Sequence, residues 1–142
     1  MSVRIEVRYE GELHTVAMHG PSGASLETDA PKDNEGRGEA FSPTDLLATA
    51  LGSCMLTVMG ILARRKGWEM AGARASVDKH MVADPVRRVG QLALRFEMPG
   101  GIPEEARKPL ERAAHTCPVH QSLHPEVAIE TSFVWEGDGP RP

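Results

Sequence analysis

Residues Leu46 to Ala63 form an uninterrupted run of 18 uncharged residues, LLATALGSCMLTVMGILA. A run of this length reaches the lower end of what is needed to span a bilayer, but a helix that is apolar all round is equally typical of the centre of a globular protein. The rest of the sequence contains no second segment of this kind and alternates polar with apolar residues. We therefore expect a buried central helix and no membrane span.

Capping signals mark both ends of this run. Ser42 is a candidate N-cap, Pro43 suits the first helical position, and Asp45 stands where it completes a capping box. At the other end, the cations at 64–66 favour a helix C-terminus and Gly67 favours its end. The sequence therefore predicts a helix that begins at Pro43 and ends just before Gly67.

The remaining segments predict an α+β fold. Period-two alternation bounded by turn residues is typical of strands. Such strands are predicted near residues 3–7, 13–18, 24–28, 69–82, 87–98 and 127–135, with helical turns after Pro103 and Cys117. Residues 29–42 are polar and glycine-rich and predict a long loop, a kind of segment that often carries function. Residues 137–142 predict a frayed tail, and residues 1–142 predict one domain.

Composition excludes several function classes. The net charge of −4 gives no basic footprint for nucleic acid, and an aromatic content of 4% is too low for large stacking platforms. The first six residues alternate in polarity, unlike a signal peptide, so we expect a cytoplasmic protein. The sequence has no phosphate loop and no dinucleotide fingerprint, and we expect no cofactor.

The chain has two cysteines, Cys54 and Cys117, which are 63 residues apart, so only the fold can bring them together. Free cysteines outside a secreted framework are reactive, metal-binding or simply buried. Cys54 shares the apolar run, as a small buried hydrophobe does. It lies about three helical turns beyond Pro43, too far for the helix dipole to lower a thiol pKa. A reactive Cys54 therefore needs a cation from elsewhere in the fold.

A metal site is an alternative reading of the second cysteine. Cys117, His120 and His124 are spaced for one face of a helix, and Cys54 is able to complete four zinc ligands. Prolines directly after Cys117 and His124 interrupt the helix that this spacing assumes, and there is no paired CxxC knuckle. A zinc-binding module therefore remains open as the weaker alternative.

The segment Ser42–Cys54, SPTDLLATALGSC, together with the lone Cys117, resembles the OsmC/Ohr family of osmotically inducible and organic hydroperoxide resistance proteins. The predicted order of strands, helices and loops is similar to that family over nearly the whole chain. The resemblance implies an intertwined homodimer, with antiparallel sheets wrapped around long central helices and two active sites at the subunit interface. It also implies that the apolar run is buried between subunits.

The activity that the resemblance implies is reduction of organic hydroperoxides to alcohols, in defence against oxidative stress. Cys54 would become a sulfenic acid, and Cys117 would condense with it to a disulfide. A dithiol reductant would restore both thiols, with a lipoyl-bearing protein as the family expectation. A redox-sensing or small-molecule-binding dimer with little turnover is the main alternative.

One departure concerns the group that activates the thiolate. In the peroxidase members of the family, an arginine does this and is held by a glutamate ten residues before the first cysteine. Here that position is Thr44, which cannot make a charge-assisted pair, and Asp45 points about 100° away around a helix. Arg37 and Glu39, in the preceding loop, are the candidate replacements, against a reading as solvated loop residues.

Overall fold

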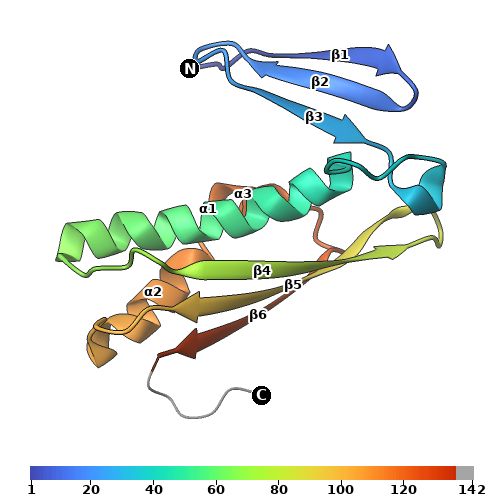
Figure 1. Cartoon of the computed structure of the whole chain (residues 1–142). Coiled ribbons are helices and arrows are strands. Elements are labelled where there is room, and N and C mark those ends of the chain that lie inside the picture. The colour runs from blue at the N-terminus through green and yellow to red at the C-terminus, as the bar shows by residue number, and fades with distance from the viewer. Residues whose placement is uncertain (137–142) are drawn as a thin grey trace. The chain divides into compact units, whose positions relative to one another are not determined.

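The structure, a computed structural model, describes residues 1–136 and consists of two compact units. The N-terminal unit comprises residues 1–47, and the C-terminal unit begins at Ala48. The N-terminal unit holds one three-stranded sheet, and the C-terminal unit holds a second sheet and most of the helical residues (Figure 1). This confirms the predicted α+β class. The predicted frayed tail at 137–142 lies outside the described residues.

The N-terminal sheet is an antiparallel meander in the order β1-β2-β3 (Figure 1). Its strands are β1 (Ile5–Gly11), β2 (His14–His19) and β3 (Ser25–Asp29). At the first turn Glu12 and Leu13 have positive φ angles of 56° and 59°, and the turn reverses the chain between β1 and β2. The predicted opening hairpin and third strand are both confirmed.

The predicted long loop follows β3 and contains one short 3-10 helix, η1 (Lys32–Asn34). The loop is closed at its base, because the Asp29 N–H donates to the Phe41 carbonyl oxygen at 3.1 Å. Gly36 lies so close to the Ala30 backbone that a Cβ atom there would overlap the carbonyl oxygen. The loop is therefore a folded segment with a fixed path.

Helix α1 (Pro43–Lys66) forms over the predicted residues. The capping box is complete: the Asp45 N–H donates to Ser42 Oγ at 3.1 Å, and the Ser42 N–H donates to Asp45 Oδ2 at 2.9 Å. The helix ends at Gly67, whose φ is +75°. Among the described helices α1 alone is long and apolar enough to cross a membrane, which is weak evidence because core helices of soluble proteins share this property.

The C-terminal sheet has the order β4-β5-β6 (Figure 1). Its strands are β4 (Arg74–Val82), β5 (Arg88–Met98) and β6 (Ala128–Trp135). β4 and β5 are antiparallel, but β6 runs parallel to β5, so the expectation of purely antiparallel sheets is corrected for this pair. The physical reason is the helical segment between β5 and β6, which supplies the crossover that a parallel pair requires.

The first strand of this sheet is shorter than predicted. The pattern predicted a strand from Glu69, whereas β4 begins at Arg74. The intervening residues form a turn, in which the Ala73 N–H donates to the Met70 carbonyl oxygen at 3.1 Å and Gly72 has a φ of +95°. A positive φ of this kind is incompatible with a continuous strand.

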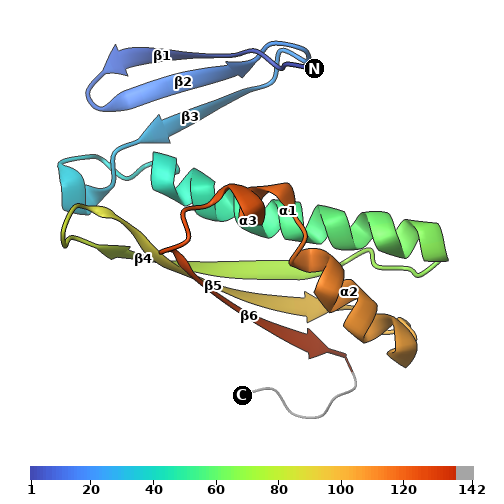
Figure 2. The same cartoon turned by 180° about the vertical axis from the view of Figure 1, so that it is seen from behind.

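Three short helices connect β5 to β6: η2 (Glu104–Ala106), α2 (Arg107–Ala114) and α3 (Pro118–Ser122). Figure 2 shows α2 and α3 from the side that is turned away in Figure 1. Ala106, Leu110 and Ala114 are fully buried and recur every four residues, which is the spacing of one helix face. Cys117 continues this buried row just beyond the end of α2.

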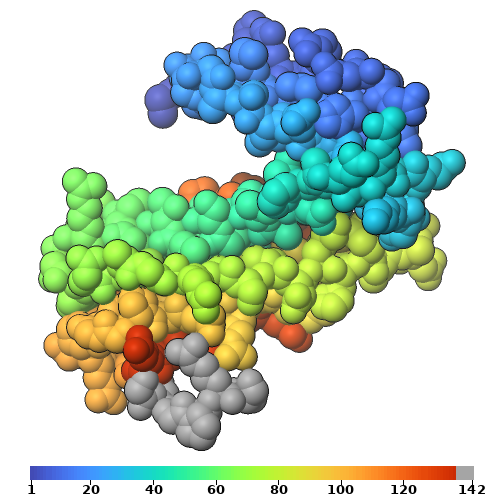
Figure 3. All heavy atoms as spheres, in the orientation of Figure 1, coloured from blue at the N-terminus to red at the C-terminus, as the bar shows by residue number. Residues whose placement is uncertain are grey.

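The hydrophobic core belongs to the C-terminal unit. Phe96 on β5 is completely buried, and its ring stacks on that of Phe133 at a centroid distance of 4.8 Å. Helix α1 contributes a buried row, and it packs closely on β4, because a Cβ at Gly52 would lie 3.0 Å from Val77 Cγ2. Figure 3 shows the atoms of α1 directly along those of β4. The buried residues of α1 are Ala48, Leu51, Gly52, Met55, Met59 and Ala63.

The N-terminal sheet, by contrast, exposes an apolar face. Ile5, Val7 and Tyr9 alternate along β1 and are about 60% exposed, at 60%, 64% and 63%. The strand register places Ala17 and Leu26 on the same face. A contiguous apolar face of this kind typically marks an interaction surface.

Candidate active site

Cys54 lies on α1 at the edge of the buried row described above. Its side chain is half-buried, whereas the neighbouring Met55 is completely buried. Ala50 and Ile61, four residues before and seven residues after Cys54 on the same helix, are exposed. Cys54 therefore stands at the boundary between the packed and the exposed faces of α1. Partial exposure of this kind is what a thiol needs in order to meet a solute.

Cys117 has a different environment, because its side chain is completely buried. It is the N-cap residue of α3, with an extended backbone (φ −63°, ψ 140°), and Pro118 occupies the first helical position. Cys117 Sγ accepts a hydrogen bond from the His120 N–H at 3.2 Å. The second cysteine is thus fixed in one orientation by the start of α3.

The fold brings the two cysteines together. Both are free thiols, and the Cys54 thiol lies close enough to Cys117 to raise the pKa of Cys117. Burial is the main cause that raises the pKa of Cys117; the His120 N–H opposes it, and the neighbouring Cys54 thiol raises it further. The protonated form of Cys117 is therefore favoured while Cys54 remains a thiol or thiolate beside it. Two sulfurs that are distant in sequence share one site.

The other two predicted site residues belong to the N-terminal unit. Arg37 Nη2 lies 3.7 Å from Glu12 Oε2, and both side chains are largely exposed. The backbone N–H of Glu39 donates to Asp29 Oδ2 at 3.1 Å. Arg37 and Glu39 thus have different partners, Glu12 and Asp29, within this unit. Their role as the pair that activates Cys54 stays a prediction.

The histidines near Cys117 bear on the zinc alternative. The rings of His115 and His120 meet edge to face at 5.9 Å, and His115 Nε2 lies 3.4 Å from Thr131 Oγ1. Within residues 1–136, no group of three or more histidine, cysteine or acidic side chains is placed to bind a metal ion. The spacing of Cys117, His120 and His124 therefore does not become a metal centre in the described part of the chain.

An apolar cavity adjoins this region. Its volume is about 380 Å³, and His120 and His124 contribute to its wall. The remainder of the lining is Leu123, Pro125, Val127, Ala128 and Ile129. The residue whose amide contacts Cys117 therefore also lines an apolar cavity.

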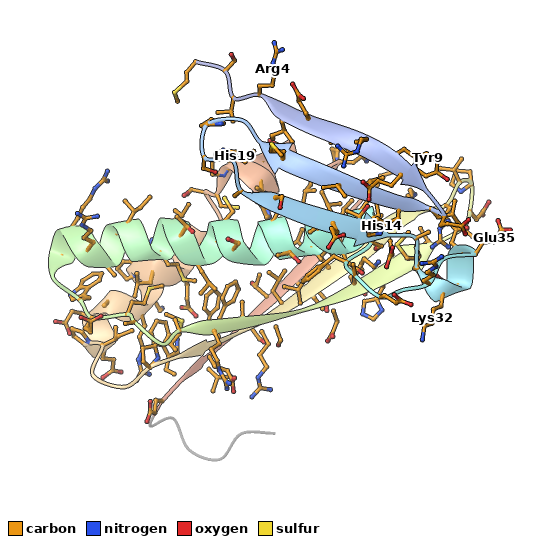
Figure 4. All side chains as sticks on the ribbon, turned by 45° about the horizontal axis from the view of Figure 1, so that its top comes forward. Arg4, Tyr9, His14, His19, Lys32 and Glu35 are labelled. Carbon is orange, nitrogen blue, oxygen red and sulfur yellow. The ribbon has the colours of Figure 1, made fainter. Side chains whose placement is uncertain are left out.

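Sequence reasoning missed a charged cluster in the N-terminal unit. His14 Nδ1 lies 2.6 Å from Asp29 Oδ1, and its Nε2 lies 2.9 Å from Glu27 Oε1 and 4.0 Å from Glu10 Oε1. Figure 4 shows His14 at the end of the sheet that faces the loop bearing Lys32 and Glu35. The strand register places His14 directly opposite Asp29, and this pairing is what brings the cluster together. The register of two strands cannot be read from a list of residue types.

Comparison with known proteins decides the family. A family model described as OsmC-like protein matches residues 36–132. The chain belongs to this family. It is 45% identical to a protein of Psychrobacter arcticus named for an osmotic stress induced and detoxification response, with a TM-score of 0.87; the match covers 92% of this chain and 94% of that one. No curated protein matches the sequence.

More distant OsmC-like structures share the fold. The OsmC like protein of Mycoplasma pneumoniae is 17% identical with a TM-score of 0.79, and the match covers 95% of this chain and 97% of that one. The organic hydroperoxide resistance protein OsmC of Legionella pneumophila is 18% identical with a TM-score of 0.74, covering 94% and 96%. The resemblance inferred from Ser42–Cys54 and Cys117 is therefore confirmed at the level of family and fold.

Proposed function

We propose that this OsmC-like protein is a thiol-dependent peroxidase that reduces organic hydroperoxides to alcohols, in defence against oxidative stress. The observation that carries the proposal is the proximity of Cys54 to Cys117, which is close enough for Cys54 to raise the pKa of Cys117. Disulfide formation requires that two cysteines be close in the folded chain. The names of the Legionella pneumophila and Bacillus subtilis structures, both organic hydroperoxide resistance proteins, support the choice of substrate.

The chemistry has two steps. The Cys54 thiolate attacks one peroxide oxygen, the O–O bond breaks, and the departing alkoxide takes a proton to become the alcohol, which leaves Cys54 as a sulfenic acid. Cys117 then attacks Cys54 Sγ, an S–S bond forms, and the S–O bond breaks with release of water. An external dithiol, for which a lipoyl-bearing protein is the expectation, reduces the disulfide and returns both cysteines to thiols.

The environments of the two thiols support these roles. Cys54 is half-buried and accessible to a solute, so it is the attacking thiol. Cys117 is completely buried, and burial raises its pKa, so it stays protonated until its neighbour is oxidised. The apolar cavity lined by Leu123 and Ile129 supports an organic substrate in preference to hydrogen peroxide.

The proposal includes an assembly. The working form is a cytoplasmic homodimer in which each chain of 142 residues acts as one OsmC-like domain. Two exposed apolar surfaces support a dimer: the β1 face with Ile5, Val7 and Tyr9, and the outer side of α1, where Ile61 is 47% exposed. Arg37 and Glu39 remain the candidate pair that stabilises the Cys54 thiolate in place of the missing glutamate at position 44.

The central test compares two cysteine variants. Cys54→Ser is expected to abolish consumption of cumene hydroperoxide in the presence of a dithiol. Cys117→Ser should retain the first step only, so that one equivalent of peroxide is consumed and a sulfenic acid accumulates that dimedone labels. Sustained peroxide consumption by Cys54→Ser would overturn the proposal.

The activating pair has its own test. Arg37→Gln is expected to lower the rate of Cys54 oxidation about tenfold, in line with the loss of about 1.4 kcal/mol of charge stabilisation. Arg8→Gln is the matched control, because Arg8 is also an exposed arginine of the N-terminal unit and pairs with Glu10 at 2.7 Å. Equal rates for the two variants would show that Arg37 is a solvated loop residue with no role in activating Cys54.

The threonine at position 44 favours a second candidate function, that of a redox sensor with slow turnover. A threonine cannot hold an activating arginine through a charge-assisted bond, so the first step would be slow. A sensor forms the disulfide once and does not sustain dithiol-dependent turnover. Steady-state peroxide consumption over many equivalents per chain separates the two functions.

A further inference from the structure

The His120 backbone amide has one prominent acceptor, the sulfur of Cys117. The N–H donates to Cys117 Sγ at 3.2 Å, and Cys54 lies close enough to Cys117 to raise the pKa of that thiol. Pro118, the first residue of α3, has no N–H and fixes the backbone where the helix begins. The sulfur that must attack the oxidised Cys54 therefore lies between backbone amide donors at the start of α3, with the His120 N–H the main one, and the other thiol.

This amide acts on a sulfur that is fully removed from water. Cys117 has 0% exposure, so solvent cannot stabilise a negative charge that develops on Sγ. Hydrogen bonds to charged groups are about twice as strong as those between neutral groups. The N–H···S bond is therefore weak while Cys117 is a thiol and strengthens as it becomes a thiolate. α3 has five residues, so this is the effect of individual backbone donors, chiefly the His120 N–H with a smaller contribution from the Val119 N–H, and not of a helix dipole.

We propose that His120 is a positioning residue for the resolving step, in which its backbone N–H stabilises the Cys117 thiolate as that sulfur attacks Cys54. This inference rests on the proposed function and deepens it. Cys117 loses its proton to the hydroxide that leaves Cys54, water is released, and the S–S bond forms. The amide donor holds the negative charge on Sγ until that bond takes up the electron pair.

Proline substitution removes the donor without removing the helix start. Proline is tolerated in the first helical turn, where N–H groups have no partner within the helix. His120→Pro therefore deletes the N–H, whereas His120→Ala changes the side chain and keeps it. Gln121→Pro is a second control, because the Gln121 N–H bonds the Cys117 carbonyl oxygen at 3.1 Å, so that variant disturbs α3 but leaves the N–H···S bond.

The first measurement is independent of peroxidase activity. In a Cys54→Ser background Cys117 is the remaining cysteine of the chain, so absorbance at 240 nm, corrected for the ionisation of the single tyrosine Tyr9, reports its ionisation. His120→Pro should raise the titration midpoint of Cys117 by about half a pH unit to one pH unit relative to His120→Ala. Gln121→Pro should leave the midpoint within about 0.3 pH units of that reference. Equal midpoints for His120→Pro and His120→Ala would overturn the inference.

A second measurement needs no proline. In ¹⁵N-labelled Cys54→Ser protein, the His120 amide resonance should shift as Cys117 ionises, more than that of Gln121. If the His120 resonance does not follow the Cys117 titration, the inference fails even where the proline variant does not fold.

The resolving step separates this inference from the proposed function. With both cysteines present, His120→Pro should slow disulfide formation about threefold to tenfold and leave the rate of sulfenic acid formation unchanged. If no variant reacts with cumene hydroperoxide while the midpoint still shifts in His120→Pro, the proposed peroxidase function fails and the thiolate contact stands. A normal resolving rate in His120→Pro would contradict the positioning role.

Discussion

The two units of this protein bury different kinds of side chain. The N-terminal unit buries Thr28, Asp29 and Ser42, which are polar, and exposes the apolar side chains of β1. The C-terminal unit buries a hydrophobic core around α1 and β5, and Cys117 within it. Hydrogen bonds and ion pairs therefore stabilise the N-terminal unit, which also has an exposed apolar surface. Hydrophobic packing stabilises the C-terminal unit.

The ionisable groups of the two units also differ, in whether the folded protein favours their charged or their neutral form. Hydrogen bonds with His14 hold the pKa of Asp29 below its ordinary value, and the hydrogen bonds with Asp29 and Glu27 raise the pKa of His14, so this pair is charged. Burial raises the pKa of Cys117, so this group is neutral at rest. A charge that the folded state favours suits a structural contact. A charge that develops only after a neighbour is oxidised suits a resolving thiol.

The largest expected effect is a loss of stability in the C-terminal unit. Phe96→Ala should lower the free energy of unfolding by about 3–5 kcal/mol, because the ring is completely buried and stacks on Phe133. Phe41→Ala makes the same change at a residue of the N-terminal unit that is 54% exposed and should cost less than about 1 kcal/mol. Urea denaturation followed by circular dichroism measures both. Equal losses would show that the two regions do not differ in this way.

The next effect concerns the exposed apolar face. If a second copy covers it, Val7→Asp should weaken the dimer by about 2 kcal/mol, which is roughly thirtyfold in the dissociation constant, because a carboxylate would be buried. Arg8→Asp places the same group on the opposite face of β1 and serves as the control. Light scattering coupled to size exclusion gives the mass of each variant. A Val7→Asp variant that remains as dimeric as Arg8→Asp would place the interface elsewhere.

The smallest effect is a pH dependence of stability. The pKa of His14 is raised from 6.5, so its contribution is complete below pH 6.5 and is lost as the pH rises through the raised value. The pKa of Asp29 is lowered from 3.8, so its contribution is present above pH 3.8 and is lost as the pH falls through the lowered value. His14→Gln should therefore destabilise the protein most between about pH 4 and 6.5, and least once the pH has risen through the raised pKa of His14.

The control for this pH profile is His19→Gln, because His19 also lies on β2 but contacts Ser22 Oγ and, among residues 1–136, no carboxylate. Thermal melts at closely spaced pH values compare the two variants. A destabilisation by His14→Gln that does not change with pH would show that His14 acts by packing alone.

Local chemistry made much of the fold predictable. Ser42, Pro43 and Asp45 predicted the start of α1, and Gly67 predicted its end, because capping depends on residues close in sequence. The parallel pairing of β6 was not predictable, since the pattern of one strand carries no information about its neighbour. The later start of β4, at Arg74 and not at Glu69, has a local cause, Gly72, to which the prediction gave less weight than to the alternation pattern.

The candidate site was predictable only in part. Cys54 and Cys117 were identified as residue types, and the family resemblance implied that they meet, but no spacing in the sequence shows that they do. The partial exposure of Cys54 depends on how α1 is turned toward β4, which is a property of packing. The His120 amide could not be identified, because every residue except proline carries the same group.

The central claim is that Cys54 and Cys117 act as one redox pair. Its most direct test is a thiol titration with peptide mass mapping, before and after one equivalent of cumene hydroperoxide per chain. We expect two free thiols before treatment and none after it, with a single intrachain Cys54–Cys117 disulfide that a dithiol reverses. Retention of both thiols, or oxidation of Cys54 alone without linkage to Cys117, would contradict the account.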